Sequence, residues 1–424
     1  MNARYLRKKY PKFIYEKYTY GISKNDLEIL FSFRIPPDIE FQPRILIRNI
    51  NKANVKRLGK ETLDNLVFNL GLIEMLSYWK ATCSPEILVK AGSLDKTQIN
   101  WWENLIIKGL GQFFYENKID WRVKGFIAIE SSGKRNNKIF NGQLKNRYLV
   151  PFAGGRDSIV TLENLKKTGK EISLFTVNPI EKIRKTIKAS GIKNRITVKR
   201  VIDRNLLSLN KKGYLNGHTP FTATLSFISL LCAAIFNYKN IAFSNEKSAE
   251  EGNLKYLGRT INHQWAKTLE FERSFPQYAR KHLVKKINYF SFLRKYGELE
   301  ISKTFIKYPQ YFSVFSSCNE GMKINTKGEL RAKKRWCGNC PKCLFVYLSL
   351  YPFLPEKQLL KIFSKDIFEN RKLLKTMQQL IGERGFKPFE CVGTKKENKL
   401  AFKLSKEKAL RQGKSLPFLL AKAK

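Results

Sequence analysis

Apolar and polar residues alternate in blocks along the middle of the chain. From Arg147 onward, short apolar runs with the length of buried strands are separated by segments whose apolar residues recur at helical spacing. We expect strands at 148–153, 171–177, 195–201 and 240–244, and helices at 157–168, 181–190 and 220–237. Strands that alternate with helices in this way predict a parallel sheet with helices on both faces. The expected fold class is therefore α/β, with a parallel doubly wound sheet.

The regions on either side of this alternation have different patterns. Residues 1–145 mix strand-like runs such as "RILIRNI" with helical segments such as "TLDNLVFNLGLIEMLSYWKA", which predicts an N-terminal α+β domain. Residues 146–352 are expected to form the central domain, with a further strand at 311–318. Residues 353–424 predict a C-terminal helical region, and we interpret the last forty residues as a basic tail.

Composition and charge narrow the class of protein. Hydrophobic residues make up 43% of the chain and aromatic residues 13%, which excludes a disordered protein. The 80 Lys and Arg residues against 35 Asp and Glu give a net charge of +45, which suits nucleic acid or a smaller polyanion such as a nucleotide. The surplus is spread over the whole chain without a nucleic-acid recognition motif, so nucleic acid is not favoured as the partner.

The location is expected to be cytoplasmic. The amino terminus is basic but lacks the apolar stretch of a signal peptide. The most apolar run, residues 227–236, is about half of the ~20 residues that a membrane-spanning helix requires. We interpret it as part of a buried core helix.

A glycine pair lies between the first strand and the first helix of the alternation. The segment "AGGRDS" comprises Ala153, Gly154, Gly155, Arg156, Asp157 and Ser158. Adjacent glycines at the start of a helix let backbone N–H groups face outward, where the helix end adds partial positive charge, so together they form a phosphate cradle. The alternative is a tight turn with a helix cap. Neither the G-x-x-x-x-G-K-[ST] loop nor the G-x-G-x-x-G fingerprint occurs in this chain.

A second candidate segment is rich in carboxylates although the chain is strongly basic. "FSNEKSAEEGN" and "NHQWAKTLEFE" contain Asn245, Glu246, Glu250 and Glu270, together with His263, one of only three histidines. The strand at 240–244 should deliver Asn245 and Glu246 to the same sheet edge as the glycine pair. Mg²⁺ coordination, binding of a substrate amine or proton transfer would suit these residue types. A solvated loop with ordinary surface carboxylates is the alternative, and we prefer it for Glu251 and Glu272.

Four cysteines predict a metal site. "CGNCPKC" supplies Cys337, Cys340 and Cys343, and Cys318 precedes them, so four thiolates can complete a tetrahedral site. Structural zinc is the first interpretation, and an iron–sulfur cluster is the alternative. Cys83, Cys232 and Cys391 are scattered along the chain and are expected to be free thiols.

These motifs resemble two known groups of proteins. "AGGRDS" is similar to the S-G-G-x-D-S loop of the PP-loop ATP pyrophosphatases, with Ala153 where that group usually has serine and with Arg156 placing a cation in the loop. "NGHTPFTATLSF", "SNEKSAEEGN", "NHQWAKTLEFE" and "CGNCPKC", in this order, resemble the UDP-N-acetyl-α-D-muramoyl-L-alanyl-L-glutamate epimerase family over roughly residues 60 to 350. The chain is more distantly similar to the 7-cyano-7-deazaguanine synthases. A tRNA-modifying PP-loop enzyme and a nucleotide-binding module without activity remain alternatives.

The resemblance to the epimerases implies a reaction and its participants. It implies ATP- and Mg²⁺-dependent inversion of the terminal L-glutamate of a UDP-linked muramoyl dipeptide through an acyl-adenylate, with functional coupling to muramoyl ligases. Residues 1–145 would then be a substrate or cap domain, and residues 146–352 a nucleotide-binding domain of the PP-loop type with a structural Zn²⁺ site.

The resemblance also suggests roles for single residues. ATP would be bound by the loop, in which Gly154, Gly155 and Ser158 hold pyrophosphate while Asp157 orders the loop or approaches Mg²⁺. Catalysis is assigned to Glu246, Glu250 and His263. Substrate binding is assigned to Asn245, Arg259, Lys267, Glu74 and Lys80. Ser77 and Trp79 lie on the same predicted helix as Glu74 and Lys80, for which ordinary packing is the alternative.

Overall fold

One large mixed sheet organises the protein. The computed structural model describes residues 1–134, 138–322, 335–413 and 415–423. The strand order in the sheet is β13-β10-β7-β8-β9-β4-β2-β1-β5-β6, with β3 paired to β2. The strands are β1 (Lys12–Ser23), β2 (Asp26–Ile35), β3 (Ile39–Phe41), β4 (Arg44–Ile47), β5 (Glu86–Val89), β6 (Ala128–Ser131), β7 (Lys145–Pro151), β8 (Ile172–Val177), β9 (Arg195–Val201), β10 (Tyr238–Phe243) and β13 (Asn288–Ser291). A separate hairpin pairs β11 (Leu254–Tyr256) with β12 (Arg259–Ile261).

The predicted alternation of strands and helices forms the parallel part of this sheet. Strands β7, β8 and β9 follow one another outward from β7, whereas β10 and β13 lie on the other side of β7, and all of these pairs are parallel. The strand order therefore reverses between β7 and β10. In open parallel sheets, the loops at such a reversal diverge and leave a crevice beyond the carboxyl ends of the strands.

The N-terminal strands extend the same sheet. Strand β4 pairs antiparallel with β9, and β2 and β1 continue the sheet in antiparallel fashion before β5 and β6 add parallel pairs. The N-terminal part is thus joined to the central part by main-chain hydrogen bonds. Residues 135–137, close to the predicted domain boundary at residue 145, lie outside the described part of the chain.

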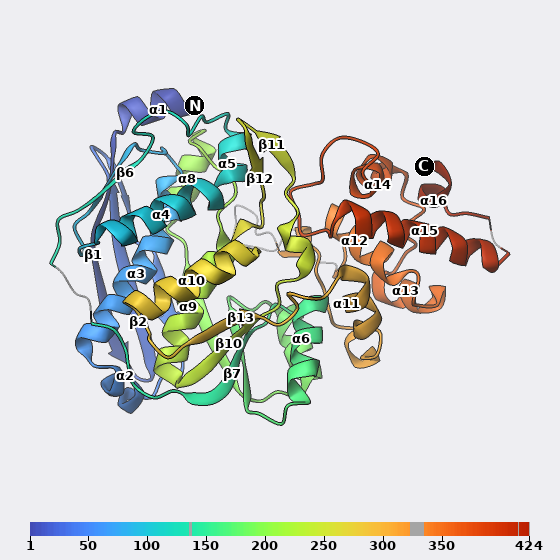
Figure 1. The fold of residues 1–424 in the computed structure, drawn as a ribbon, viewed down its shortest axis with the longest axis horizontal. Helices are drawn as coiled ribbons and strands as arrows, with labels where there is room; N and C mark the ends of the chain where they lie inside the picture. Colours follow the sequence, from blue (N-terminus) through green and yellow to red (C-terminus); the bar gives the residue numbers. More distant parts are fainter. Residues whose placement is uncertain (135–137, 323–334, 414, 424) are drawn as a thin grey trace.

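Helices cover both faces of the sheet. The helices are α1 (Ala3–Lys9), α2 (Lys52–Leu58), α3 (Lys60–Trp79), α4 (Lys96–Gly109), α5 (Gly111–Glu116), α6 (Arg156–Lys166), α7 (Glu181–Ser190), α8 (Arg204–Lys211), α9 (Phe221–Phe236), α10 (Leu269–His282), α11 (Glu298–Phe305), α12 (Pro341–Leu350), α13 (Glu356–Phe363), α14 (Leu374–Ile381), α15 (Lys395–Arg411) and α16 (Phe418–Lys422). Figure 1 shows α3, α9 and α10 in the large lobe, with α6 between that lobe and the C-terminal helices.

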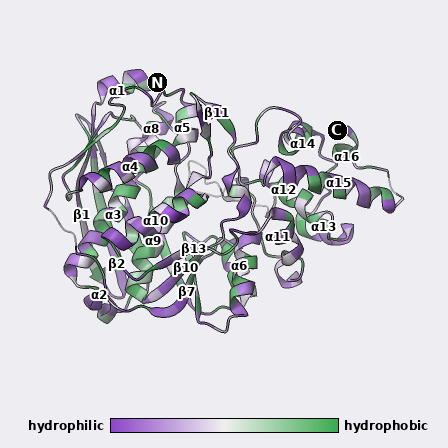
Figure 2. Cartoon of the chain, in the orientation of Figure 1, coloured by the Kyte–Doolittle hydropathy of each residue, from purple (hydrophilic) through white to green (hydrophobic). Residues whose placement is uncertain are grey.

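Two hydrophobic cores result from this arrangement, one on each side of the sheet. Successive residues of β7 point to opposite faces, so Leu149 packs into the core with α3 and α9, while Val150 packs into the core with α6 and the C-terminal helices. Helix α9 is buried along most of its length, which explains why it is apolar on all sides (Figure 2). No helix in the described part of the chain combines the length and the apolar character needed to cross a bilayer.

Two expectations about the later part of the chain were wrong. Residues 311–318 form no strand: a 3-10 turn at Pro309–Tyr311 is followed by bends, because this segment wraps the ends of α6 and α7 instead of joining the sheet. The basic last forty residues are not an extended tail. Thr394 and Glu397 form a capping box that starts α15, and Ala401 and Phe402 of this helix are buried among the C-terminal helices.

Candidate functional site

The glycine pair makes a turn between β7 and α6 that no other residue type would adopt easily. Gly154 has φ +72°, and a Cβ there would lie 3.1 Å from Thr186 Oγ1. Gly155 is the N-cap of α6, and a Cβ at this position would lie 2.9 Å from Ser317 Oγ. No side chain in the described part of the chain caps α6 at its start. Its first N–H groups are therefore available to an anion.

A cavity of about 250 Å³ lies at the reversal of strand order, next to this turn. The loop after β7, the start of α6, the end of β10 and the start of α9 all contribute to its wall. Its polar lining comes from Gly155, Asp157, Ser158, Ser244, Asn245 and Lys267, and its apolar lining includes Phe152, Phe175, Phe221 and Phe243. The predicted proximity of the glycine pair to Asn245 is thus confirmed, because the carboxyl ends of β7 and β10 are adjacent.

The Arg156 side chain does not place a cation in the loop, contrary to the sequence-based expectation. Its guanidinium is 1% exposed and points behind the loop, where it pairs with Glu298 and donates to Ser302 Oγ at 2.8 Å and Ser349 Oγ at 2.9 Å. Its Nε is 3.0 Å from Asp157 Oδ1. Arg156 therefore fastens the start of α6 to α11 and α12.

Buried charges surround this arginine. Burial alone would raise the pKa of Asp157, but the nearby cations Arg156, Lys342 and Lys267 hold that pKa below its ordinary value. Glu298 behaves differently, since burial and its neighbours Asp157 and Glu246 raise its pKa to about 7 in spite of Arg156. Asp157 thus stays ionised at the cavity, whereas Glu298 behind it takes up a proton near neutral pH.

The cation in the cavity is Lys267. It ends the 3-10 turn Trp265–Lys267, and its Nζ lies 4.0 Å from Glu246 Oε1. Burial would lower its pKa, but the surrounding Cys391, Glu246 and Asp157 raise it, so the ammonium form is retained. Asn245 Nδ2 donates to Ser291 Oγ at 2.9 Å, which fixes the amide. Glu246 is 1% exposed, and its Oε2 has no hydrogen-bond partner among the described residues.

Two of the predicted site residues lie elsewhere. Glu250 Oε1 accepts from the Leu269 N–H at 2.6 Å and from Arg294 at 3.0 Å, so this carboxylate stabilises the start of α10. Arg259 is exposed on β12 and lines a different cavity, together with Glu270. His263 is placed beside Cys391, with 3.8 Å between Nε2 and Sγ.

The predicted residues of the N-terminal helix are buried and paired. Arg200 at the end of β9 donates to Glu74 Oε2 and to Ser77 Oγ, both at 2.8 Å. Lys80 donates to the carbonyl of Gly217 at 2.5 Å, and burial together with Arg200 lowers its pKa to about 8. These contacts hold α3 against the sheet, and the loop after α8 against α3. Trp79 is fully buried and donates to the carbonyl of Ser84.

The four predicted cysteines converge on one point. The Sγ atoms of Cys318, Cys337, Cys340 and Cys343 all lie within 4.8 Å of one another and can hold a metal ion. The Sγ–Sγ distance is 3.5 Å for Cys340 and Cys343, 3.7 Å for Cys337 and Cys343, and 4.0 Å for Cys318 and Cys340. Four backbone N–H groups donate to these sulfurs at 3.4 Å, as expected for a metal-binding knuckle.

Two segments next to the cysteine cluster contact residues around the cavity. The segment before Cys318 packs on the glycine pair, and the Ser316 N–H donates to the carbonyl of Gly154 at 3.2 Å. On the other side, Lys342 lies between two of the cysteines, and its Nζ donates to the carbonyl of Cys391. The cluster thereby positions both the glycine loop and the loop that carries Cys391.

Comparison with known proteins decides the family. The family model of the MurL N-terminal domain matches residues 5–292. The family model of the MurL C-terminal domain matches residues 314–422. The chain belongs to the MurL family. Three relatives carry the name UDP-N-acetyl-alpha-D-muramoyl-L-alanyl-L-glutamate epimerase.

The similarity to these MurL relatives covers most of both chains. The protein of Xanthomonas oryzae pv. oryzae is 33% identical over 332 residues, which are 78% of this chain and 72% of the relative. The protein of Salinispora tropica is 35% identical over 348 residues, or 82% and 74%. The protein of a Micromonospora species is 34% identical over 347 residues, or 82% and 76%. Family membership predicted from the motifs is therefore confirmed.

Sequence reasoning missed three residues that this MurL structure brings to the site. Cys391 of the C-terminal helical region contacts Lys267, Lys342 of α12 contacts Cys391, and Glu298 lies behind the glycine loop. Cys391 carried no signal because it stands alone in the sequence. Lys342 lies inside the "CGNCPKC" motif, where only the cysteines drew attention.

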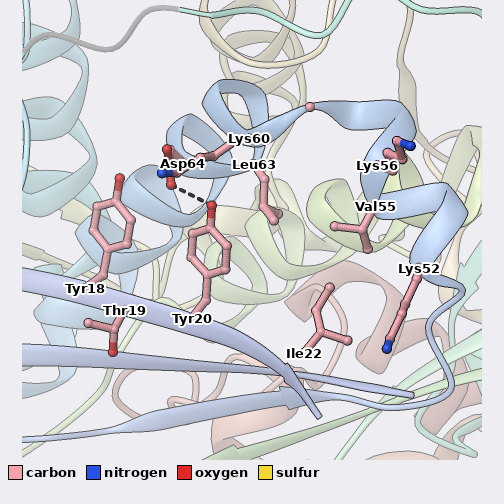
Figure 3. Close-up of a pocket in the computed structure, with 11 residues that line it drawn as sticks. Tyr18, Thr19, Tyr20, Ile22, Lys52, Val55, Lys56, Lys60, Leu63 and Asp64 are labelled. Atoms are coloured by element: carbon pink, nitrogen blue, oxygen red, sulfur yellow. Dashed lines mark hydrogen bonds between the residues drawn. The ribbon is translucent and has the colours of Figure 1, made fainter. Parts of the chain in front are cut away.

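A larger cavity lies away from this chemistry. It measures about 790 Å³ and is formed by β1, α2 and α3 on the N-terminal part of the sheet (Figure 3). Tyr18, Ile22, Val55 and Leu63 make its wall mainly apolar, and the one hydrogen bond drawn within it joins Tyr20 to Asp64 at 2.7 Å. It contains none of the predicted site residues, so volume alone does not locate the site.

Proposed function

We propose that this protein is an ATP- and Mg²⁺-dependent epimerase that inverts the terminal L-glutamate of UDP-MurNAc-L-Ala-L-Glu in peptidoglycan precursor synthesis. The names of the MurL relatives support the substrate and the inversion. The observation that carries the use of ATP is the glycine pair at the reversal of strand order, next to the uncapped start of α6. Because ATP and UDP-linked precursors are cytoplasmic compounds, we assign the reaction to the cytoplasm, where it would be functionally coupled to the muramoyl ligases.

The loop is proposed to act as in PP-loop enzymes, by holding the β,γ-pyrophosphate of ATP. The N–H groups at Gly155 and the start of α6 would donate to phosphate oxygens, and Ser158 lies in the same cavity wall. Ala153 removes one hydroxyl donor from this loop. The Lys267 ammonium compensates for it, since it lines the same cavity and remains charged.

Oxygen atoms suited to Mg²⁺ face the same cavity. The ionised Asp157 and the amide-bearing Asn245 both line it. Carboxylate and amide oxygens are the protein ligands that Mg²⁺ prefers, and the ion usually bridges carboxylates and substrate phosphates. When bound, Mg²⁺ would neutralise phosphate charge during transfer of AMP. Asp157 and Asn245 would hold it.

Adenylation explains why an inversion needs ATP. The α-proton of a carboxylate is very weakly acidic, because its removal places a second negative charge beside the first. Transfer of AMP from ATP to the α-carboxylate of the terminal glutamate would release pyrophosphate and yield an acyl phosphate. Its carbonyl can take up the electron pair of the broken α C–H bond as an enolate. Lys267 is placed to stabilise that developing charge. Reprotonation from the opposite face and hydrolysis of the acyl phosphate then give the D-glutamyl product, UDP-MurNAc-L-Ala-D-Glu, and AMP.

We propose Zn²⁺ for the four-cysteine cluster. A tetrahedral Zn²⁺ with bonds of about 2.3 Å to sulfur requires sulfur atoms about 3.8 Å apart. The separations of 3.5 Å, 3.7 Å and 4.0 Å support a single ion. An iron–sulfur cluster binds its cysteines through different iron atoms, which would separate the sulfurs more widely. The proposed role is structural, because all four positions are filled by protein ligands.

The test is a coupled assay on the full chain. The protein with ATP, Mg²⁺ and UDP-MurNAc-L-Ala-L-Glu should release AMP, and chiral analysis after acid hydrolysis should show D-glutamate. Lys267→Met should lower AMP release at least about 100-fold, since it removes the cavity cation. Arg259→Ala is the matched control, because Arg259 is an exposed cation in a different cavity, and it should leave the rate unchanged. AMP release without any inversion, or inversion without ATP, would contradict the proposal.

A further inference from the structure

Cys391 lies in a cluster of chemically active side chains next to the cavity. Its sulfur accepts a hydrogen bond from Lys267 Nζ at 3.3 Å and is 3.8 Å from His263 Nε2. Its carbonyl accepts a hydrogen bond from Lys342 Nζ. Unlike Cys83 and Cys232, which are fully buried in hydrophobic core, Cys391 is partly exposed. This thiol is therefore both accessible and close to cations.

His263 is oriented toward the Cys391 sulfur by a buried amide. Asn253 Oδ1 lies 3.3 Å from His263 Nδ1 and also accepts the His263 backbone N–H at 3.1 Å. Asn253 Nδ2 in turn donates to the carbonyl of Pro388 at 2.8 Å, in the loop that carries Cys391. With Nδ1–H directed at the amide oxygen, Nε2 is free to accept a proton from the thiol. A thiol, a histidine and an orienting amide form the arrangement that activates a cysteine.

The state of His263 suits this task. Burial lowers its pKa well below the ordinary value, and His218 and nearby lysines lower it further. The imidazole is therefore neutral at neutral pH, so Nε2 can accept a hydrogen bond from the thiol and pass a proton on without retaining it.

Lys267 connects the thiol to the proposed reaction site. Its Nζ is 3.3 Å from the Cys391 sulfur and 4.0 Å from Glu246 Oε1, so a thiol and a carboxylate flank one ammonium group. An enolate oxygen bound to Lys267 would hold the adjacent α-carbon between these two groups. An inversion requires such an arrangement, with one proton acceptor and one proton donor on different sides of the α-carbon.

We propose that Cys391 and Glu246 exchange the α-proton of the adenylated glutamate, and that His263 positions and deprotonates Cys391. This rests on the proposed epimerase function. The Cys391 thiolate takes the proton from the α-carbon, and the electron pair of the broken C–H bond moves into the carbonyl to form the enolate. The carboxylic acid form of Glu246 then donates its proton to the opposite face, and the enolate electron pair forms the new C–H bond. Proton exchange with solvent restores the thiolate, through His263, and the carboxylic acid.

The experiment separates adenylation from inversion. In the Cys391→Ser variant, AMP release with ATP, Mg²⁺ and UDP-MurNAc-L-Ala-L-Glu should stay within about threefold of the wild type. Formation of D-glutamate should fall at least about 100-fold, because a hydroxyl is a far weaker acid than a thiol and general acid–base catalysis contributes this much. The matched control is Cys232→Ala, which removes another free thiol from the core and should change neither rate.

A second variant and an isotope measurement complete the test. His263→Asn should lower inversion more than AMP release and should slow alkylation of Cys391 by iodoacetamide, a readout that a purely structural role would not change. In D₂O, recovered L-glutamate should incorporate deuterium at the α-carbon with the wild type and much less with Cys391→Ser.

Each outcome is decisive. Normal inversion by a folded Cys391→Ser variant overturns the proposal, as does equal loss of AMP release and inversion. If Cys391→Ser does not fold, the His263→Asn readouts decide in the same way. If the wild type itself releases no AMP with this substrate, the proposed function fails first and the role of Cys391 falls with it.

Discussion

The buried ion pair between Arg156 and Glu298 provides a sharp test of how the glycine loop is held. The Arg156 side chain is 1% exposed and that of Glu298 is 2% exposed, and Arg156 also donates to two serine hydroxyls behind the loop. Arg156→Met keeps an apolar chain of similar length but removes the charge and all of these donors. Removal of one partner of a buried pair typically costs about 3–5 kcal/mol.

The loss of stability caused by Arg156→Met should depend on pH because Glu298 has a raised pKa. A carboxyl whose pKa is higher in the folded state than the ordinary 4.5 stabilises the fold below that ordinary value, and this stability is lost as the pH rises through the folded pKa of about 7. Without Arg156, the folded pKa of Glu298 must rise further. In the Arg156→Met variant only, the free energy of unfolding therefore continues to fall above pH 7, by at most about 1.4 kcal/mol per pH unit.

Thermal unfolding of the full chain at pH 6, 7.5 and 9 measures both effects. Arg156→Met should lower Tm by about 3–6 °C at pH 7.5, since the entropy of unfolding is about 0.9 kcal/mol/K for 424 residues, and the gap from the wild type should widen toward pH 9. Glu298→Gln should cost much less, because Asp157 remains as a partner for Arg156. The double variant should be more stable than Arg156→Met at pH 9, since it no longer has to protonate a carboxyl.

An exposed arginine supplies the control. Arg184 is 63% exposed and lies 3.9 Å from Glu181, which is also exposed. Arg184→Met should change the free energy of unfolding by no more than about 0.5 kcal/mol. A Tm shift for Arg156→Met as small as that of Arg184→Met, or a shift that is the same at all three pH values, would refute the reasoning.

Three further predictions follow from the site. Cys340→Ser should lower the zinc content of the protein, measured by atomic absorption. It should also weaken ATP binding, measured by calorimetry, because the cysteine cluster supports the loop at Gly154. An ATP affinity equal to that of the wild type in the zinc-free variant would count against this. Gly155→Ala should weaken ATP binding at least about tenfold, since the added Cβ would project from the N-cap of α6. Tm should change little, because the Cβ would meet only the movable hydroxyl of Ser317, at 2.9 Å. Burial and Lys80 lower the pKa of His218 to about 4, so its contribution to stability is present above pH 6.5 and is lost as the pH falls toward 4. The decrease in Tm over this pH range should therefore be smaller in His218→Asn than in the wild type. Identical dependences of Tm on pH in the two proteins would contradict this prediction.

The sequence predicted the local elements of the central region closely. The helix expected at 181–190 is α7 at the same residues, and the strand expected at 195–201 is β9. Strongly periodic segments of this kind are specified locally, because their spacing determines which face can be buried. The strand predicted at 311–318 was wrong. The apolar residues of this segment pack against helices, and a short apolar run has no periodicity that distinguishes such a segment from a strand.

The site was predictable where it is carried by consecutive residues. The glycine pair and three of the four cysteines lie in contiguous motifs, and Cys318 joins the other three cysteines in the structure. Glu250 and Arg259 were assigned from the resemblance to the epimerases, but a capping interaction in one case and a separate hairpin in the other direct them elsewhere. Both residues lie in the sequence segment that contributes to the site, but the sequence did not determine where their side chains point.

The sequence by itself determined the family, the glycine turn, the cysteine ligands and the order of strands and helices along the chain. Only the tertiary structure decided that the Arg156 charge lies behind the loop, that Lys267 supplies the cation, and that Cys391 meets His263. The physical reason is that a turn or a metal knuckle forms from neighbouring residues with local backbone preferences. The direction of a charged side chain depends instead on which distant partner can offset its burial, and that partner is known only when the chain has folded.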